Sequence, residues 1–167
     1  MKILVFSDSH GRCEKMVDIA KEFIAKNGTL DYIIHLGDLV RDAEELRKKF
    51  PEIPVLYVYG NGDFSYDISD NEKEYVIGGK KFFILHGHTR RVNFSLDSLK
   101  SLAEQKKYDI ILYGHTHIPK EDFHEGTYIV CPGSVSLDRS GKGNSYCVID
   151  ITGNDMCANI ILTSPKY

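Results

Sequence analysis

The sequence predicts an α/β protein in which two mixed β-sheets pack face to face, with helices on the outside. Short runs of β-branched and aromatic residues recur along the chain, and glycine or polar residues bound each run, which is typical of buried strands. Segments with helical periodicity separate the first runs, which favours parallel strands joined by crossovers. Later runs follow one another closely across glycine turns. The sheets are therefore expected to be mixed.

The first part of the chain alternates strands with helices. Met16, Ile19 and Phe23 recur at helical spacing, so a helix is expected there, and Gly28 supplies its C-terminal stop. A shorter helix is expected to end before Pro51, because proline cannot continue a helix. The expected elements are strands over residues 2–6, 32–36 and 55–59 and the shorter helix over residues 42–50.

The rest of the chain follows a different rhythm. Residues 66–71 are polar and are expected to form a loop, and Gly78-Gly79 is a two-residue hairpin signal. A third helix is expected over residues 95–106, with Ser95 as its N-cap. Strands are expected over residues 74–77 and 81–85 and near residues 110–113, 127–131, 145–151 and 158–163.

Composition places the chain among ordinary globular proteins. Its 167 residues suit a single domain over residues 1–167, and 42% of them are hydrophobic. The net charge of -3 lacks the basic footprint of a dedicated nucleic-acid binder, so no stable nucleic-acid complex is expected. No apolar run approaches the roughly 20 residues that a membrane helix needs. The start of the chain has no cleavage pattern for secretion, and a cytoplasmic location is expected.

Five of the apolar runs end in knots of Asp, His, Asn and Gly. In open α/β sheets, sites form where the chain leaves the carboxyl ends of strands, so these side chains are expected to converge. Their donors are carboxylates, imidazoles and an amide, and the four cysteines, which have no metal-binding spacing, are interpreted as packed thiols. Such donors suit Mn²⁺, the preferred expectation, or Ni²⁺, Zn²⁺ or Fe. The candidate metal ligands are Asp8, His10, Asp38, Asn61, His86, His115 and His117.

This set of donors is large enough for two ions, and the two oxygens of Asp38 could bridge them. Two divalent ions about 3.5–4 Å apart clamp the entering and departing oxygens of a phosphoryl centre, and they lower the pKa of a bridging water to about 7. No serine or cysteine nucleophile motif is present, and attack by hydroxide needs none. The expected reaction is metal-assisted hydrolysis of small phosphoesters.

The order of these motifs resembles the calcineurin-like metallophosphoesterase superfamily. The series D-x-H, G-D, G-N-x-D, H-G-H and G-H-T-H runs from Asp8 to His117, and the later Cys131-Pro-Gly-Ser-Val-Ser136 segment is similar to an N-P-G-S element of the superfamily. With the short chain, these motifs point to the small bacterial and archaeal phosphodiesterase subfamily, which includes relatives of a retromer scaffold subunit. The resemblance implies a four-layer αββα sandwich. It also implies one metal on Asp8, His10, Asp38 and His117 and a second on Asp38, Asn61, His86 and His115.

One position departs from the superfamily pattern. Many members have histidine third in G-N-H-D, where it hydrogen-bonds phosphate or protonates the leaving group, and here that residue is Gly62. Some members of the small subfamily have cysteine there, so the change alone does not indicate inactivity. A general acid is worth about 10²–10⁴ in rate, so slow turnover of esters with poor leaving groups is expected. Asn61 and His88 are the candidate catalytic residues, and His88 is the nearest candidate acid in the sequence.

Simpler roles are expected for the neighbours of these motifs. His35 lies inside an apolar run and is interpreted as a packed histidine, and Asp63 is interpreted as an acceptor of backbone hydrogen bonds in its turn. Arg90 and Arg91 are interpreted mainly as solvated charge. The alternative to an enzyme is a catalytically weak or inactive interaction module that keeps the fold. Gly62 favours that alternative and the complete ligand set opposes it, while the edge strands leave a homodimer open.

Overall fold

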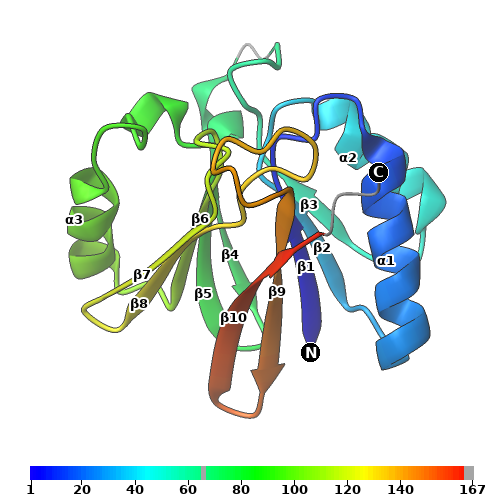
Figure 1. Cartoon of the computed structure of the whole chain (residues 1–167). Coiled ribbons are helices and arrows are strands. Elements are labelled where there is room, and N and C mark those ends of the chain that lie inside the picture. Colours follow the sequence, from blue (N-terminus) through cyan, green and yellow to red (C-terminus); the bar gives the residue numbers. More distant parts are fainter. Residues whose placement is uncertain (65–66, 164–167) are drawn as a thin grey trace.

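The computed structural model describes residues 1–64 and 67–163, which form two five-stranded sheets and the helices that cover them (Figure 1). The first sheet contains β1 (Lys2–Phe6), β2 (Tyr32–His35), β3 (Val55–Tyr57), β9 (Ser145–Thr152) and β10 (Asp155–Leu162). The second contains β4 (Glu72–Ile77), β5 (Lys80–Leu85), β6 (Ile110–Tyr113), β7 (Lys120–His124) and β8 (Thr127–Cys131). The helices are α1 (Cys13–Asn27), α2 (Val40–Lys49), α3 (Asp97–Lys106) and the short 3₁₀ turns η1 (Ile68–Asn71) and η2 (His88–Arg90).

Both sheets are mixed, as the sequence predicts. The first has the strand order β10-β9-β1-β2-β3, in which β1, β2 and β3 are parallel and β9 and β10 form an antiparallel hairpin. The second has the order β4-β5-β6-β8-β7, in which β5, β6 and β8 are parallel and the two edge strands are antiparallel to their neighbours. Because parallel strands run in one direction, their carboxyl ends lie along one edge of each sheet.

Three apolar clusters hold four layers together. One fills the space between the sheets, a second joins the first sheet to α1 and α2, and a third joins the second sheet to α3. Strand β1 supplies two clusters because its side chains alternate: Ile3 and Val5 face the other sheet, whereas Leu4 and Phe6 face the helices. This burial on both faces explains why β1 is an unbroken apolar run. The layers form the αββα sandwich that the resemblance implies.

Most expected elements are present, and some ends are shifted. Helix α2 covers residues 40–49 rather than 42–50, and residues 68–71 of the expected loop form η1, while Tyr66 lies outside the described residues. Helix α3 begins at Asp97 with Leu96 as its N-cap, so the expectation that Ser95 is the cap is wrong. The Ser95 hydroxyl instead accepts a hydrogen bond from the Asp97 amide at 3.0 Å, in a turn that precedes the helix.

Strand β7 was not expected from the sequence. Its residues, Lys-Glu-Asp-Phe-His, lack an apolar alternation because this edge strand is largely exposed. It forms nevertheless, because every residue of β7 pairs with a residue of β8 in an antiparallel ladder. The hairpin between β4 and β5 has the turn that the sequence indicates: Gly78 and Gly79 both have positive φ, at 58° and 78°.

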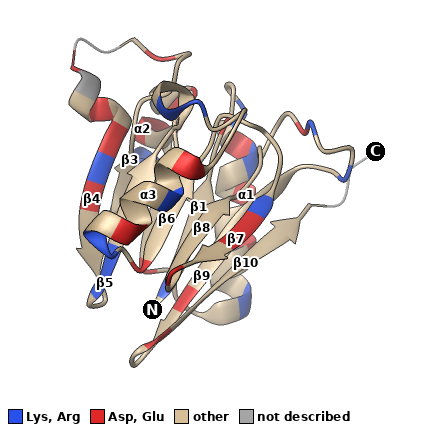
Figure 2. Cartoon of the chain, turned by 90° about the vertical axis from the view of Figure 1, so that its left-hand side faces the viewer, with Lys and Arg blue, Asp and Glu red and all other residues tan. Residues whose placement is uncertain are grey.

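The outer surface carries mixed charge. On the side that Figure 2 turns toward the viewer, acidic and basic residues alternate along β4 and α3 without a continuous basic area. None of the helices in residues 1–64 and 67–163 combines the length and apolar character needed to cross a bilayer.

Candidate metal centre

The loops that leave the strands share an unusual backbone conformation. Asp8, His10, Asp38, His115 and His117 all have positive φ, between 46° and 69°. Non-glycine residues avoid this region, and holding one there costs of order 1–3 kcal/mol. Five such residues, all candidate ligands, lie in three loops. Strain concentrated at these positions indicates that the fold maintains their geometry for a functional purpose.

Four of the seven candidate ligands form a tight group. One ligand atom from each of Asp8, His10, Asp38 and His117 lies within 4.8 Å of the others, although these residues follow three different strands, β1, β2 and β6. Oδ1 of Asp8 is 3.1 Å from Nε2 of His117, which is 3.3 Å from Nε2 of His10. This group is the one that the resemblance assigns to the first metal.

The remaining candidates form a second group that also reaches Asp38. Nε2 of His86, which follows β5, is 3.1 Å from Oδ1 of Asn61 and 3.4 Å from Oδ1 of Asp38. The ring of His115 packs edge-on against that of His86, with centroids 5.1 Å apart. Asp38 therefore lies between the two groups, where a bridging ligand would have to be.

The protonation pattern shows that these atoms fit a metal. Nδ1 of His86 lies 2.7 Å from the carbonyl of Leu36 and Nδ1 of His117 lies 2.8 Å from the carbonyl of Leu137. A carbonyl can only accept, so in each neutral imidazole Nδ1 carries the proton and Nε2 is a bare acceptor. Each Nε2 then points at carboxylate or amide oxygens, which are also acceptors. When both rings are neutral, these converging lone pairs need a cation between them, and an outer carbonyl that holds the ring is the usual arrangement for a metal-binding histidine.

Asp8 supplies the clearest sign of a cation site. Its Oδ2 accepts hydrogen bonds from the backbone amide of His115 and from the hydroxyl of Ser7. Its Oδ1 is buried and lies 3.1 Å from Nε2 of His117, so it has no hydrogen bond whenever that nitrogen carries no proton. An unpaired buried carboxylate oxygen is costly, and a coordinated metal ion would remove the cost.

The surroundings of two of these ligands favour the deprotonated forms that bind metal ions. Burial alone would raise the pKa of Asp8, but hydrogen bonds from His117 and Ser7 and the nearby His86 lower it, so Asp8 remains a carboxylate. Burial and the neighbouring His86 lower the pKa of His115, which keeps its imidazole neutral. The pKa of His117 is raised, because pairing with Asp8 outweighs burial. A metal ion at this position would take the place of that proton.

Residues outside the ligand motifs hold the loops in place. The hydroxyls of Ser134 and Ser136 both donate to the backbone carbonyl of Asp8, at 2.8 and 3.0 Å, and the next residue, Leu137, supplies the carbonyl that holds His117. In the sequence, the segment from Cys131 to Ser136 is recognisable only as an element of the family, and no role was predicted for its serines. Its signal was the small-residue pattern itself, because serine hydroxyls commonly bind backbone groups in such turns.

Asp63 acts as expected, as an acceptor in its turn. Its carboxylate accepts the backbone amides of Asp38, Val40 and Gly60, at 3.1, 2.8 and 2.8 Å. Gly60 is required sterically, because a Cβ there would lie 2.2 Å from Oδ1 of Asp38. Asp63 and Gly60 thus fix the loop after β3 against the carboxylate that lies between the two groups.

His88 and Gly62, the two positions that the sequence connects with leaving-group protonation, lie beside members of the second group. His88 is half-buried, with its ring 5.4 Å from that of His86 and 6.1 Å from that of His115, and burial followed by the neighbouring His86 lowers its pKa. Gly62 has no positive φ, and its amide donates to Oδ1 of Asp38 at 2.8 Å. A Cβ at residue 62 would lie 3.2 Å from the same oxygen. A side chain there would therefore begin beside the shared carboxylate.

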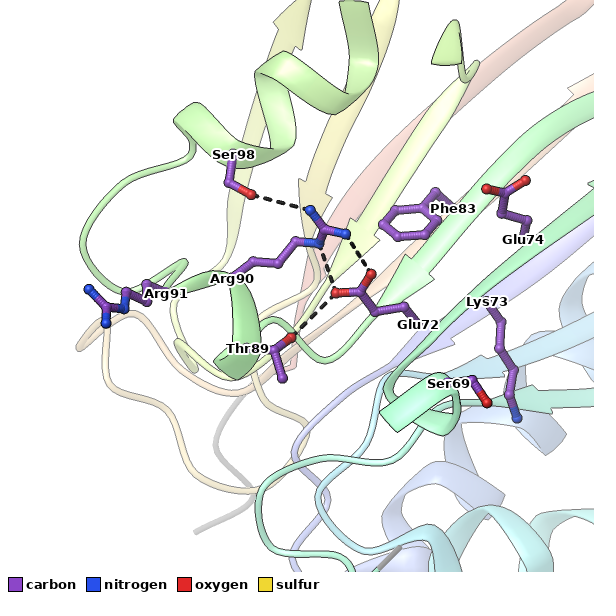
Figure 3. A pocket seen from close by; sticks show the side chains of 9 residues that line it. All are labelled: Ser69, Glu72, Lys73, Glu74, Phe83, Thr89, Arg90, Arg91 and Ser98. Atoms are coloured by element: carbon purple, nitrogen blue, oxygen red, sulfur yellow. Dashed lines mark hydrogen bonds and ion pairs between the residues drawn. The ribbon is translucent and has the colours of Figure 1, made fainter. Parts of the chain in front are cut away.

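An open pocket of about 690 Å³ lies between η2, α3 and the start of β4 (Figure 3). Its lining includes Thr89 and Arg90, the two residues that follow His88 in the chain. Arg90 lies in this pocket and is not free to bind phosphate: its guanidinium donates twice to Glu72, at 2.7 Å each, and lies over the ring of Phe83. Arg91 also lines the pocket and is exposed. The ion pair with Glu72 thus engages one of the two arginines.

Comparison with known proteins agrees with this geometry. The sequence model of the calcineurin-like phosphoesterase superfamily domain matches residues 1–154. The chain is 34% identical over 152 residues to the probable metallophosphoesterase YsnB of Bacillus subtilis, covering 90% of this chain and 85% of that protein. It is 26% identical over 182 residues to the phosphodiesterase YfcE of Escherichia coli strain K12, covering 97% of this chain and 92% of that protein.

A solved structure has the same fold at lower sequence identity. Vps29 of Entamoeba histolytica, crystallised with Zn²⁺, superposes with a TM-score of 0.71 at 18% identity, over 96% of this chain and 98% of that chain. At this identity the likeness concerns the fold alone. The family model and the enzymes named above, together with the converging Asp and His side chains, lead to one conclusion: the chain belongs to the calcineurin-like phosphoesterase superfamily and is a metallophosphoesterase.

Proposed function

We propose that this metallophosphoesterase hydrolyses small phosphodiesters at a centre of two divalent cations. The observation that carries the proposal is the set of acceptor atoms gathered around Asp38, which includes the buried Oδ1 of Asp8 and Nε2 of His86. The name of the relative YfcE supports a diester over a monoester. Asp8, His10, Asp38 and His117 would hold one ion, and Asp38, Asn61, His86 and His115 would hold the other.

Two such ions, when bound, withdraw charge from phosphoryl oxygens and acidify water at neutral pH. The protein's own contribution is positioning. The carbonyls of Leu36 and Leu137 orient two of the imidazoles, and the amide of Gly62 directs the carboxylate of Asp38. Asn61 places an uncharged oxygen beside His86, where it can bind an ion without adding negative charge. His88 is the proposed proton donor to the leaving group. Its lowered pKa means that only a small fraction of His88 is protonated, and able to donate, near neutral pH.

Mn²⁺ is the proposed metal, with Ni²⁺, Zn²⁺ and Fe as alternatives, because nitrogen and oxygen donors bind all of them. A cytoplasmic location is proposed as well. It is supported by the four cysteines, which are all free thiols in the structure, since reducing compartments keep thiols in that form. A homodimer stays a prediction; β10 is an eight-residue edge strand with exposed Ile161 and Leu162, which suits pairing with a second copy.

Replacing His115 tests the proposed site directly. The His115→Ala variant should hydrolyse bis-p-nitrophenyl phosphate at least about 10²-fold more slowly than the wild type in Mn²⁺, because one ion loses an imidazole ligand. Turnover is measured with each of Mn²⁺, Ni²⁺, Zn²⁺ and Mg²⁺, and bound metal is counted by elemental analysis. Equal activity in the two proteins, or no activity in the metal-loaded wild type, would contradict the proposal.

A second experiment concerns the missing histidine. Gly62→His should raise kcat/KM for diesters with alkyl leaving groups by about 10-fold or more relative to aryl diesters, since only poor leaving groups need a proton in the transition state. The backbone at residue 62 allows the substitution, because its φ is not positive. Gly62→Ala controls for the added Cβ near Asp38. A folded Gly62→His variant that accelerates both ester types equally would show that this position has no part in leaving-group protonation.

The alternative of a non-catalytic interaction module has weak support. The shared fold of Vps29 and the glycine at residue 62 favour it, but the contacts among the seven candidate ligands support an enzyme. An enzyme is therefore the better description of the chain.

A further inference from the structure

We infer that His35 is a positioning residue that couples the two loops carrying Asp8, His10 and Asp38, and thereby sets the metal affinity of the centre. This inference rests on the proposed metal centre and assigns a role to a side chain that is not itself a candidate ligand. His35 is the last residue of β2 and is completely buried. Its two ring nitrogens bind different loops.

One nitrogen binds the loop after its own strand. The backbone amide of Gly37 donates to Nδ1 of His35 at 3.3 Å. Gly37 has φ of 95°, and Asp38 and Leu39 after it also have positive φ. The histidine therefore holds the beginning of a three-residue turn with positive φ, in which Asp38, the proposed shared ligand, and Leu39 are the strained residues.

The other nitrogen binds the loop after β1. Nε2 of His35 is 2.9 Å from the hydroxyl of Ser9, the residue between Asp8 and His10. Because Nδ1 accepts from Gly37, the ring proton must be on Nε2, which donates to Ser9. The hydroxyl of Ser9 can then donate to the carbonyl of Asp38, at 3.4 Å. The chain of donors runs in one direction, from the His35 ring through Ser9 to Asp38.

These bonds reinforce two backbone contacts between the same loops. The amide of Asp8 donates to the carbonyl of Gly37 at 3.1 Å, and the amide of His10 donates to the carbonyl of Asp38 at 3.4 Å. Burial lowers the pKa of His35 to about 4, so the ring keeps its neutral form, and with it the direction of the chain, at neutral pH. Without the His35 ring, the two loops would lose the side-chain link that reinforces these backbone contacts against the strained φ values.

Three substitutions separate the two halves of the link. In His35→Asn, the side-chain oxygen can take the place of Nδ1 and keep the bond from Gly37. In His35→Gln, the side-chain NH₂ can take the place of Nε2 and keep the bond to Ser9. Ser9→Ala removes the Ser9 half from the other side. Each variant is measured in the metal-free state for its melting temperature and by titration calorimetry for Mn²⁺ affinity, so the result does not depend on turnover.

We expect Ser9→Ala and His35→Asn each to weaken Mn²⁺ binding by about 10–100-fold, the usual cost of losing an outer partner of metal ligands. His35→Gln should retain more of the affinity than His35→Asn. The double variant Ser9→Ala/His35→Asn should bind no more weakly than the worse single variant, since both changes break the same bond.

Thr127→Val is the matched control. Thr127 is also buried, and its hydroxyl donates to the carbonyl of Tyr108 at 2.6 Å. It is the first residue of β8, so it lies at the end of that strand away from the metal centre. The control should lower the melting temperature and leave Mn²⁺ affinity unchanged. If Ser9→Ala and His35→Asn behave like Thr127→Val, His35 is only a core residue and the inference is wrong. If the wild type itself binds no Mn²⁺, Ni²⁺ or Zn²⁺, the proposed centre fails first.

Discussion

The Asp38→Asn variant should lose about 10³-fold or more in kcat toward bis-p-nitrophenyl phosphate, together with most of its bound metal. Asp38 belongs to the close group with Asp8, His10 and His117, and its Oδ1 is also 3.4 Å from Nε2 of His86. Asparagine keeps the size and one oxygen, but it removes the negative charge that both proposed ions would share. Lewis-acid stabilisation by bound metal is worth several kcal/mol of barrier, which corresponds to about three or more powers of ten in rate.

The measurement combines elemental analysis of the purified variant with steady-state kinetics in saturating Mn²⁺. Asp18→Asn, on the exposed face of α1, is the matched control and should behave as the wild type. The side-chain oxygen of the introduced asparagine can still accept the amide of Gly62, so the metal-free variant should remain folded. Retention of wild-type metal content with activity within about tenfold would refute the assignment of Asp38 as the shared ligand.

The second large effect concerns stability. Asp63→Ala should lower the free energy of unfolding by about 3 kcal/mol, because the backbone amides of Asp38, Val40 and Gly60 lose a charged acceptor, and each such bond contributes about 1.5–3 kcal/mol before water partly replaces it. Urea unfolding of the metal-free protein measures the change. Asp63→Asn should fall between wild type and alanine, since a single carbonyl oxygen can keep the two amides that now share Oδ2.

The same substitution should weaken Mn²⁺ binding, because two of the three amides belong to the loops that carry Asp38 and Asn61. Asp109→Ala is the comparison: this carboxylate accepts the amide of Lys81 near the start of β6, away from the metal centre. It should lower stability less and leave metal affinity intact. An Asp63→Ala protein as stable as the wild type would show that the loop after β3 does not depend on this carboxylate.

Local sequence determined most of the fold. The apolar run of β1 and the Gly78-Gly79 turn are decided by nearest neighbours, because strand propensity and positive φ are local properties. Strand β7 could not be predicted in this way, since its exposed residues carry no apolar pattern and its pairing with β8 comes from backbone hydrogen bonds. The shift at the start of α3 has a local origin instead, because the Ser95 hydroxyl closes a turn with the amide of Asp97 before the helix begins.

For the site, the sequence by itself determined the types of donor and the strands that deliver them, because a ligand must follow the carboxyl end of a strand to reach a shared edge. Only the tertiary structure decided how those donors are held. The fold holds Asp8 and Asp38 in a left-handed backbone conformation. Segments far apart in the chain are joined by the carbonyls of Leu36 and Leu137 and by the link through His35. Such contacts form only when the spacing between loops is right to within a few tenths of an ångström. No local pattern of residues specifies that spacing.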